Sequence, residues 1–150
     1  MIEYNQIQED LQTLLSNGTF TDTIKEFFIE GMERDFMLGN MPFINIRLGS
    51  ANLDLISIPN GYYGTINFKI DIAAMDFTAF SKAAIVRDRI MKEAQSLIQA
   101  NRAFSANIQT STVGPGVEFS AGIAELNDVE KGHIASATFD VVVEAYVEPT

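Results

Sequence analysis

One stretch, residues 76–101, is long and regular enough to form a single uninterrupted helix in a chain of 150 residues. It contains no proline or glycine. With residues placed 100° apart around a helix axis, its apolar side chains fall inside one arc of about 160°. The arc holds Phe80, Ala83, Ala84, Val86, Ile90, Met91, Ala94, Leu97 and Ile98. A stripe this wide is typical of a helix that packs on a sheet.

Two residues interrupt the stripe. Arg87 falls inside the apolar arc, and Ile85 falls on the polar side. The favoured interpretation is that Arg87 lays its methylene groups along the core and reaches its charge to solvent. The alternative is that Arg87 and Ile85 both contact a neighbouring subunit, although a single exposed isoleucine is weak evidence for an interface.

On both sides of the helix, apolar and polar residues alternate as they do in β-strands. The alternation is clearest in residues 65–73, where Ile66, Phe68, Ile70 and Ile72 are expected to face inward. Other strands are predicted at residues 41–48, 53–58, 104–113, 117–124 and 133–147. Turns are expected at Pro59-Asn60-Gly61 and at Gly114-Pro115-Gly116, and a polar loop at residues 126–132. The last strand is far longer than the usual 5–6 residues, so we expect it to project or bend.

The N-terminal part begins with a predicted amphipathic helix at residues 4–16. Ile7, Leu11, Leu14 and Leu15 have the spacing i, i+4, i+7, i+8, and Asn17-Gly18 is a suitable helix end. Residues 24–30 fit either a helix or a strand, and the strand is favoured. Residues 31–41 are expected to form a connecting loop.

These elements predict one domain covering residues 1–150, with an α+β fold. The expected architecture is a two-layer sandwich: a mostly antiparallel sheet covered by the long central helix and the N-terminal helix. The other face of the sheet is expected to meet water or another subunit. A chain of this length buries enough surface to fold without a disulfide or a metal.

Composition excludes several classes of function. The chain has no cysteine, which rules out disulfides, thiolate metal sites and cysteine nucleophiles. We expect no signal peptide and no membrane contact, because no basic N-terminal region precedes an apolar run and no apolar run approaches 18 residues. The net charge of −10 disfavours binding nucleic acid through phosphates, but it suits a protein past which DNA slides without sticking.

No pattern of catalytic residues stands out. His133 is the only histidine and is expected to be a surface or strand-edge side chain. The carboxylates Asp54, Asp71, Asp140 and Glu144 lie on strands, where alternate carboxylates usually mark a solvated face rather than an acid pair. Gly114-Pro115-Gly116 lacks the lysine of a phosphate-binding loop. The sequence therefore predicts a protein that is not an enzyme and has no cofactor or metal.

The order of the elements carries more information. An N-terminal helix and an irregular segment lead to the strand entry Met41-Pro42-Phe43-Ile44-Asn45-Ile46, a hairpin and a further strand. One long helix, a Gly-Pro-Gly hairpin and the alanine-rich strand GHIASATFDVVVEAYV follow. This layout resembles the tail terminator (tail completion) proteins of tailed bacteriophages over nearly the whole chain. The match is one of layout and length, without a diagnostic motif, and phage neck and tail-tube proteins have related layouts.

The resemblance implies a structural virion protein of the tail or neck, assembled in the host cytoplasm. Such a protein forms a cyclic homo-oligomer, usually a hexamer, that caps the tail tube, ends tail growth and joins the tail to the head connector. DNA would pass through its lumen without specific binding. The alternatives are another neck or tail-tube protein, or a small ligand-binding or enzymatic domain.

The resemblance also implies that ring contacts lie on loops and long hairpins, here residues 31–41, 60–64 and 113–117. Together with the two helix residues, this gives a set of candidate interface residues. The set is Ile85, Arg87, Tyr62, Tyr63, Val113 and Val117.

Overall fold

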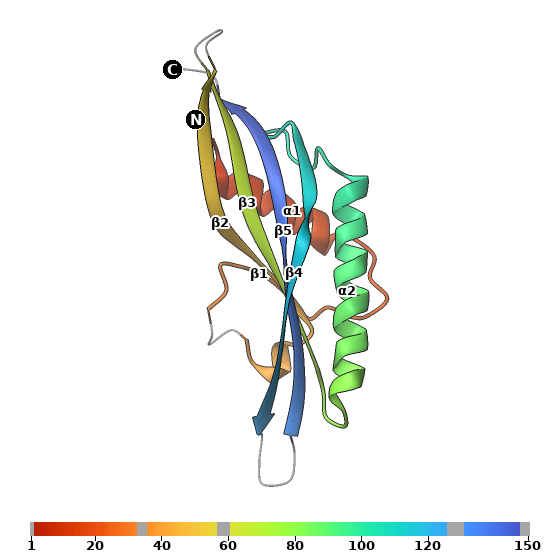
Figure 1. Ribbon diagram of the computed structural model, residues 1–150. Helices are drawn as coiled ribbons and strands as arrows, with labels where there is room; N and C mark the ends of the chain where they lie inside the picture. The colour runs from red at the N-terminus through yellow and green to blue at the C-terminus, as the bar shows by residue number, and fades with distance from the viewer. Residues whose placement is uncertain (1, 33–35, 57–60, 126–130, 148–150) are drawn as a thin grey trace.

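The computed structural model describes residues 2–32, 36–56, 61–125 and 131–147 (Figure 1). Five strands form one sheet in the order β1-β2-β3-β5-β4, antiparallel throughout except for the parallel pair β1 and β2. The elements in chain order are α1 (Tyr4–Ser16), β1 (Glu26–Ile29), the short 3-10 helix η2 (Leu38–Asn40), β2 (Phe43–Ile56), β3 (Gly61–Asp76), α2 (Phe80–Ala100), β4 (Thr110–Glu125) and β5 (Lys131–Val147). The predicted α+β sandwich with a mostly antiparallel sheet is confirmed.

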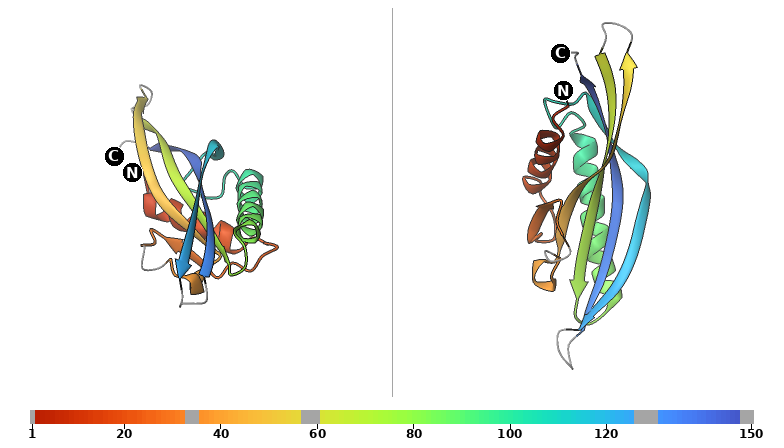
Figure 2. Two further views of the ribbon diagram at one scale, coloured as in Figure 1. Left: turned by 60° about the horizontal axis from the view of Figure 1, so that its bottom comes forward. Right: turned by 90° about the vertical axis from the view of Figure 1, so that its left-hand side faces the viewer.

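Both helices pack on one face of the sheet, which we call the helix face (Figures 1 and 2). The alternating residues of β3 that were expected to face inward are all fully buried there. The same apolar cluster includes Ile7, Leu11 and Leu15 of α1, Ile90, Ala94 and Ile98 of α2, and Phe139, Val141 and Val143 of β5. Since each strand alternates its side chains, the opposite face carries the polar set, and we call it the outer face.

The helix boundaries agree with the sequence at α1 but not at the start of α2. The predicted helix at residues 4–16 is confirmed. The long helix begins at Phe80, four residues later than predicted. The Asp76 carboxylate accepts hydrogen bonds from the Thr78 backbone N–H (2.8 Å), the Thr78 hydroxyl (2.7 Å) and the Ala79 backbone N–H (3.1 Å). These bonds form a turn before the helix and lower the pKa of Asp76 to about 2.

The segment that fitted either a helix or a strand contains β1, so the favoured interpretation is confirmed. β1 pairs with the first residues of β2 in parallel, with Phe27 beside Ile44. This pairing needs a partner 17 positions away along the chain, which explains why local periodicity alone left the choice open.

The two strands predicted at residues 41–48 and 53–58 are wrong, because one continuous strand, β2, runs from Phe43 to Ile56. A bulge between Leu48 and Ser50 shifts the register against β3. The extra residue reverses the alternation, so Leu48 and Ala51 lie on the same face although they are three positions apart. The predicted strand end at residues 57–58 and most of the turn at 59–61 lie outside the described residues.

The predicted Gly-Pro-Gly hairpin is also wrong. Residues 110–125 form the single strand β4, and the Gly-Pro-Gly segment is a bulge in it, between Val113 and Val117. β4 pairs with β5 on both sides of this bulge, and residues 104–109 are not a strand. The long last strand is confirmed and includes residues 131–132, which were assigned to the preceding loop. Residues 126–130 lie outside the described residues.

At one end, the β2–β3 hairpin extends past both helices, as the right-hand view of Figure 2 shows. Leu53, three residues before the end of β2, is 47% exposed. Strands of 14 and 16 residues are about 50 Å long, whereas the 21 residues of α2 span about 32 Å. The helices are therefore too short to cover the whole sheet.

Part of the outer face is covered by the chain itself rather than by water or another subunit. The ring of Phe36 stacks on that of Phe43, with centroids 4.6 Å apart, and Phe28 contacts both rings edge-on. Met41 and Ala73 complete this second, smaller apolar cluster. The described part of the predicted contact loop at residues 31–41 therefore packs back on its own sheet.

Candidate interaction surface

The strand β4 forms one edge of the sheet, and its side chains from Glu118 to Ile123 are exposed. Two of them are large and apolar: Phe119 is 56% exposed and Ile123 is 62% exposed. Both lie on the helix face, because they pair with Ala137 and His133 of β5. The edge of the sheet thus presents unpaired backbone together with apolar side chains.

The first half of α2 lies beside this edge. The guanidinium carbon of Arg87 lies 4.8 Å from the ring centroid of Phe119, within range of a cation–π contact. Arg87 also donates a hydrogen bond of 2.8 Å from Nε to the Asp88 carboxylate. Phe80, in the first turn of α2, is itself 38% exposed. Helix and strand therefore contribute apolar groups to one continuous surface.

A shallow pocket of about 290 Å³ lies within this surface, lined by Phe80, Ala121, Gly122, Ile123 and His133. Its lining is mostly apolar, and His133 is half-buried at the start of β5. We use the name β4 surface for Phe80, Phe119, Ala121 and Ile123. An exposed apolar group of this kind beside a free strand edge favours binding to another protein chain.

The opposite edge of the sheet is different, because side chains of the same chain occupy its backbone groups. The Phe27 carbonyl of β1 accepts a hydrogen bond of 2.8 Å from the Gln12 amide of α1. The Leu48 N–H of β2, just beyond the end of β1, donates a bond of 2.6 Å to the Glu30 carboxylate. Among the described residues, the side-chain hydrogen bond to the β4 backbone between residues 117 and 123 comes from Ser136 of the paired strand β5, to the Ser120 carbonyl at 3.5 Å. The β1–β2 edge is therefore capped near β1 by Gln12 and Glu30, whereas β4 is an open edge that no other element of the described chain caps.

The outer face carries a polar network centred on Asp71. Its carboxylate accepts two hydrogen bonds from Arg47 (2.6 and 2.9 Å), one from the Thr138 hydroxyl (2.7 Å) and one from the Asn45 amide (3.0 Å). Burial raises the pKa of the Asp71 carboxyl, but these bonds outweigh burial, so its pKa lies below the ordinary value. The buried Asn45 also accepts the Gly31 N–H at 2.8 Å, which links the network to the segment after β1. These hydrogen bonds join side chains of β2, β3 and β5, which indicates that the network has a structural role.

The other predicted carboxylates are paired as well. Lys69 donates a bond of 3.0 Å to Asp140, and a hydrogen bond between Tyr63 and Glu144 raises the pKa of the Tyr63 phenol. The side chain of Asp54 lies outside the described residues. Asp71, Asp140 and Glu144 therefore lie on the outer face as predicted, each with a partner from a neighbouring strand.

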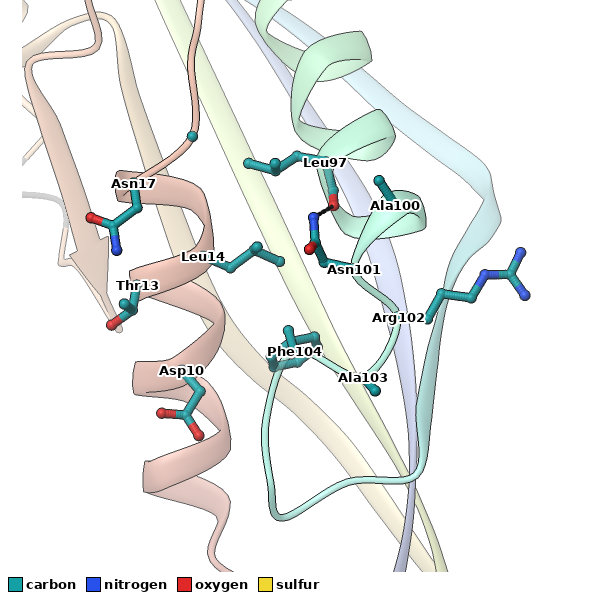
Figure 3. A pocket seen from close by; sticks show the side chains of 11 residues that line it. Asp10, Thr13, Leu14, Asn17, Leu97, Ala100, Asn101, Arg102, Ala103 and Phe104 are labelled. Carbon is teal, nitrogen blue, oxygen red and sulfur yellow. Dashed lines mark hydrogen bonds between the residues drawn. The ribbon is translucent and has the colours of Figure 1, made fainter.

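A cavity of about 730 Å³ lies between the C-terminal ends of α1 and α2 (Figure 3). Leu14 and Leu97 project into the space between the helices, whereas the guanidinium of Arg102 points away. Asp10, on the rim, already accepts hydrogen bonds from Ser105 (2.6 Å) and Gln6 (2.8 Å). The lining brings together no nucleophile and base, so its geometry does not indicate a reaction.

The candidate interface residues do not form one site. Ile85 is 60% exposed on the outward side of α2, and Tyr63 is half-buried on the outer face. Val113 and Val117 flank the bulge in β4 and pack partly against the main core. The side chain of Tyr62 lies outside the described residues.

The structure corrects the favoured interpretation that the charge of Arg87 reaches into solvent. Its side chain is only about 10% exposed, so its charge does not reach freely into solvent; it pairs with Asp88 and lies over Phe119. Sequence reasoning did not single out Phe80, Phe119 or Ile123 as surface residues. The alternation of Val117, Phe119, Ala121 and Ile123 was visible, but only the strand order shows that this strand is an edge and that α2 leaves Phe119 and Ile123 mainly exposed.

Among the described residues, no three His, Asp or Glu side chains come together as metal ligands. No helix in the described part of the chain is both long and apolar enough to cross a membrane. No protein-family model matches the chain, and no curated protein is similar to it in sequence.

Proposed function

We propose that this chain is a structural subunit that works by assembling with other protein chains. The observation that carries this proposal is the open edge strand β4, with exposed Phe119 and Ile123 beside Phe80. An uncovered strand edge with apolar flanks tends to associate, and folded proteins that stay monomeric usually block such edges. At the other edge the side chains of Gln12 and Glu30 occupy the Phe27 carbonyl and the Leu48 N–H.

Within this class we propose a tail terminator of a tailed bacteriophage, because the layout of the elements resembles that family. The subunit would form a ring, expected to be a hexamer, in the virion between tail tube and head connector. The extended β2–β3 hairpin, with Leu53 exposed, suits contact with one of these axial partners (Figure 2). The charge of −10 per subunit suits a lumen through which DNA passes without being held.

Ile85 is the best-placed described residue for the lateral contact between ring subunits, because it is the one large apolar side chain exposed on the outward side of α2. We expect Ile85→Asp to prevent ring formation. Gln99→Asp is the matched control: it places the same charge at another exposed position of the same helix and should leave rings intact. Head-to-tail contacts of this kind close into a ring when the rotation between subunits closes.

The test is the mass of the purified protein by light scattering over a concentration series, with negative-stain images, alone and with isolated tail tubes. Closed rings, formed alone or only at tube ends, would support a terminator. Open filaments formed by the protein alone would indicate a tail-tube subunit instead. A protein that neither forms rings nor binds tubes would contradict the proposal and favour the ligand-binding alternative.

A further inference from the structure

The β4 surface is complementary to itself. A twofold axis perpendicular to the sheet turns β4 into a neighbouring antiparallel strand and keeps the helix face on the same side. With the axis at Ala121, Phe119 of one copy lies opposite Ile123 of the other, and Ile123 lies opposite Phe119. Pairs of an aromatic and a β-branched residue are among the more favourable cross-strand pairs. The small alanine at the axis leaves room for both large side chains.

The charges of the edge also fit this arrangement. In the same register Glu118 lies opposite Ala124, so the two Glu118 residues do not face each other across the two strands. The two Glu118 carboxylates, one from each copy, are six positions apart along the strand, which is about 20 Å. This exceeds the screening length of about 8 Å at physiological ionic strength.

The shape of the surface points to the same partner. The pocket of about 290 Å³ is lined by Ile123, the residue that lies opposite Phe119 of the second copy in this register. The apolar side chains of both copies would then fill the space between the two α2 helices above the paired strands.

Hydrogen bonds at the opposite edge disfavour head-to-tail pairing along β1 and the adjoining part of β2. Head-to-tail pairing would need β4 to add to β1 or to the free part of β2. On that edge the Phe27 carbonyl already binds Gln12, and the Leu48 N–H already binds Glu30. Pairing there would first have to break these bonds, whereas pairing of β4 with β4 needs only the open edge.

We therefore propose that the partner of the β4 surface is a second copy of this chain, paired antiparallel through residues 117–125 about a twofold axis at Ala121. Because the twofold contact uses the β4 edge of both copies, no β4 edge is left for a third copy and the assembly is a dimer. It does not rest on the proposed ring, which needs a different contact such as the one at Ile85.

The absence of native cysteine makes the contact directly testable. Directly opposite residues of antiparallel strands have Cα atoms about 4.5–5.5 Å apart, which a disulfide can bridge. We expect Ala121→Cys to form a disulfide-linked dimer under mild oxidation, seen on a non-reducing gel and reversed by reductant. Ala100→Cys, at the exposed end of α2, is the matched control and should stay monomeric on the gel.

Two further variants separate this proposal from the ring. Phe119→Ser with Ile123→Ser, added to Ala121→Cys, should abolish the cross-link while circular dichroism stays unchanged, because both side chains are mainly exposed. Ile85→Asp should block rings yet leave the cross-link and a dimer mass in light scattering. The proposal is overturned if Ala121→Cys cross-links no better than Ala100→Cys, or if the double serine variant cross-links as well as Ala121→Cys alone.

Discussion

The carboxylate of Glu30 accepts a hydrogen bond from the backbone N–H of Leu48, with an N–O distance of 2.6 Å. This bond lies just beyond the end of β1, where the N–H of β2 would otherwise have no partner. Glu30 has a positive φ of 51°, which is uncommon for a residue other than glycine. The same carboxylate accepts a bond of 2.9 Å from the buried amide of Gln8. Glu30 therefore combines an uncommon backbone conformation with a side chain that caps the Leu48 N–H at one edge of the sheet.

Glu30→Ala should lower the free energy of unfolding by about 1–2 kcal/mol, because it removes hydrogen bonds to the Leu48 N–H and the Gln8 amide. Urea denaturation followed by circular dichroism measures the change. Glu9→Ala, at an exposed position of α1, is the control and should change stability by less than about 0.5 kcal/mol. Equal losses in the two variants would show that the contacts of Glu30 do not matter for stability.

Asp71→Asn should destabilise the protein at neutral pH by about 1–3 kcal/mol, because an amide cannot accept the paired bonds from Arg47. The folded-state pKa of Asp71 lies below its ordinary value, so the unfolded chain takes up the proton first as pH falls. The stabilisation is complete above about pH 4 and is lost as pH falls through the folded-state pKa. The difference between wild type and variant should therefore shrink in acid.

Denaturation curves at a series of pH values between neutral and acidic test this expectation. Asp140→Asn provides the comparison, because Asp140 and Lys69 are each about one-third exposed and such pairs contribute at most about 1 kcal/mol. A difference between wild type and Asp71→Asn that stays constant down to strong acid would contradict the role of the ionised carboxylate.

Gly49→Ala should destabilise the protein by about 1–3 kcal/mol, since a Cβ atom at Gly49 would lie 2.9 Å from the backbone carbonyl oxygen of Asn67. That oxygen belongs to the neighbouring strand and cannot move aside as a side chain can. Gly116→Ala is the matched control in the other bulge, where a Cβ would meet nothing within 4 Å. Thermal melts of the two variants should differ clearly; similar melting temperatures would mean that β2 can shift at its bulge.

Arg87→Ala should lower the free energy of unfolding by about 2 kcal/mol, because it removes buried methylene groups from the face of α2 that packs on the sheet. Arg87→Met keeps the length and apolar volume of the side chain, and we expect it to cost less than about 1 kcal/mol. Chemical denaturation compares the two. If Arg87→Met is as destabilising as Arg87→Ala, the charge rather than the packing is what stabilises this position.

Local periodicity was enough to place α1, the inward face of β3 and the long strand β5. Ile66, Phe68, Ile70 and Ile72 alternate without interruption, and a strand buried on one face needs only that pattern. The layers of the fold could also be predicted, because one long helix and one short helix were all that could cover the apolar face.

Bulges could not be predicted in the same way. The predicted break between residues 48 and 53 and the predicted Gly-Pro-Gly turn both fall at bulges inside continuous strands, with one extra residue in β2 and two in β4. Whether a glycine ends a strand or bends it depends on the partner across the ladder. The incorrect strand at residues 104–113 has the same origin. When Gly-Pro-Gly is interpreted as a turn, the residues before it are assigned to a separate strand, whereas β4 begins only at Thr110 and continues through Gly-Pro-Gly.

The amino-acid sequence by itself determined which residues are apolar on one side of each element, and therefore the two-layer α+β fold around β3 and α2. Only the tertiary structure decided which strands lie at the edges, that Gln12 and Glu30 guard one edge, and that Phe119 and Ile123 remain exposed on the other. The physical reason is that amphipathic periodicity is a property of neighbouring residues, whereas strand order is set by pairing between segments far apart in the chain. The candidate interaction surface arises from that order.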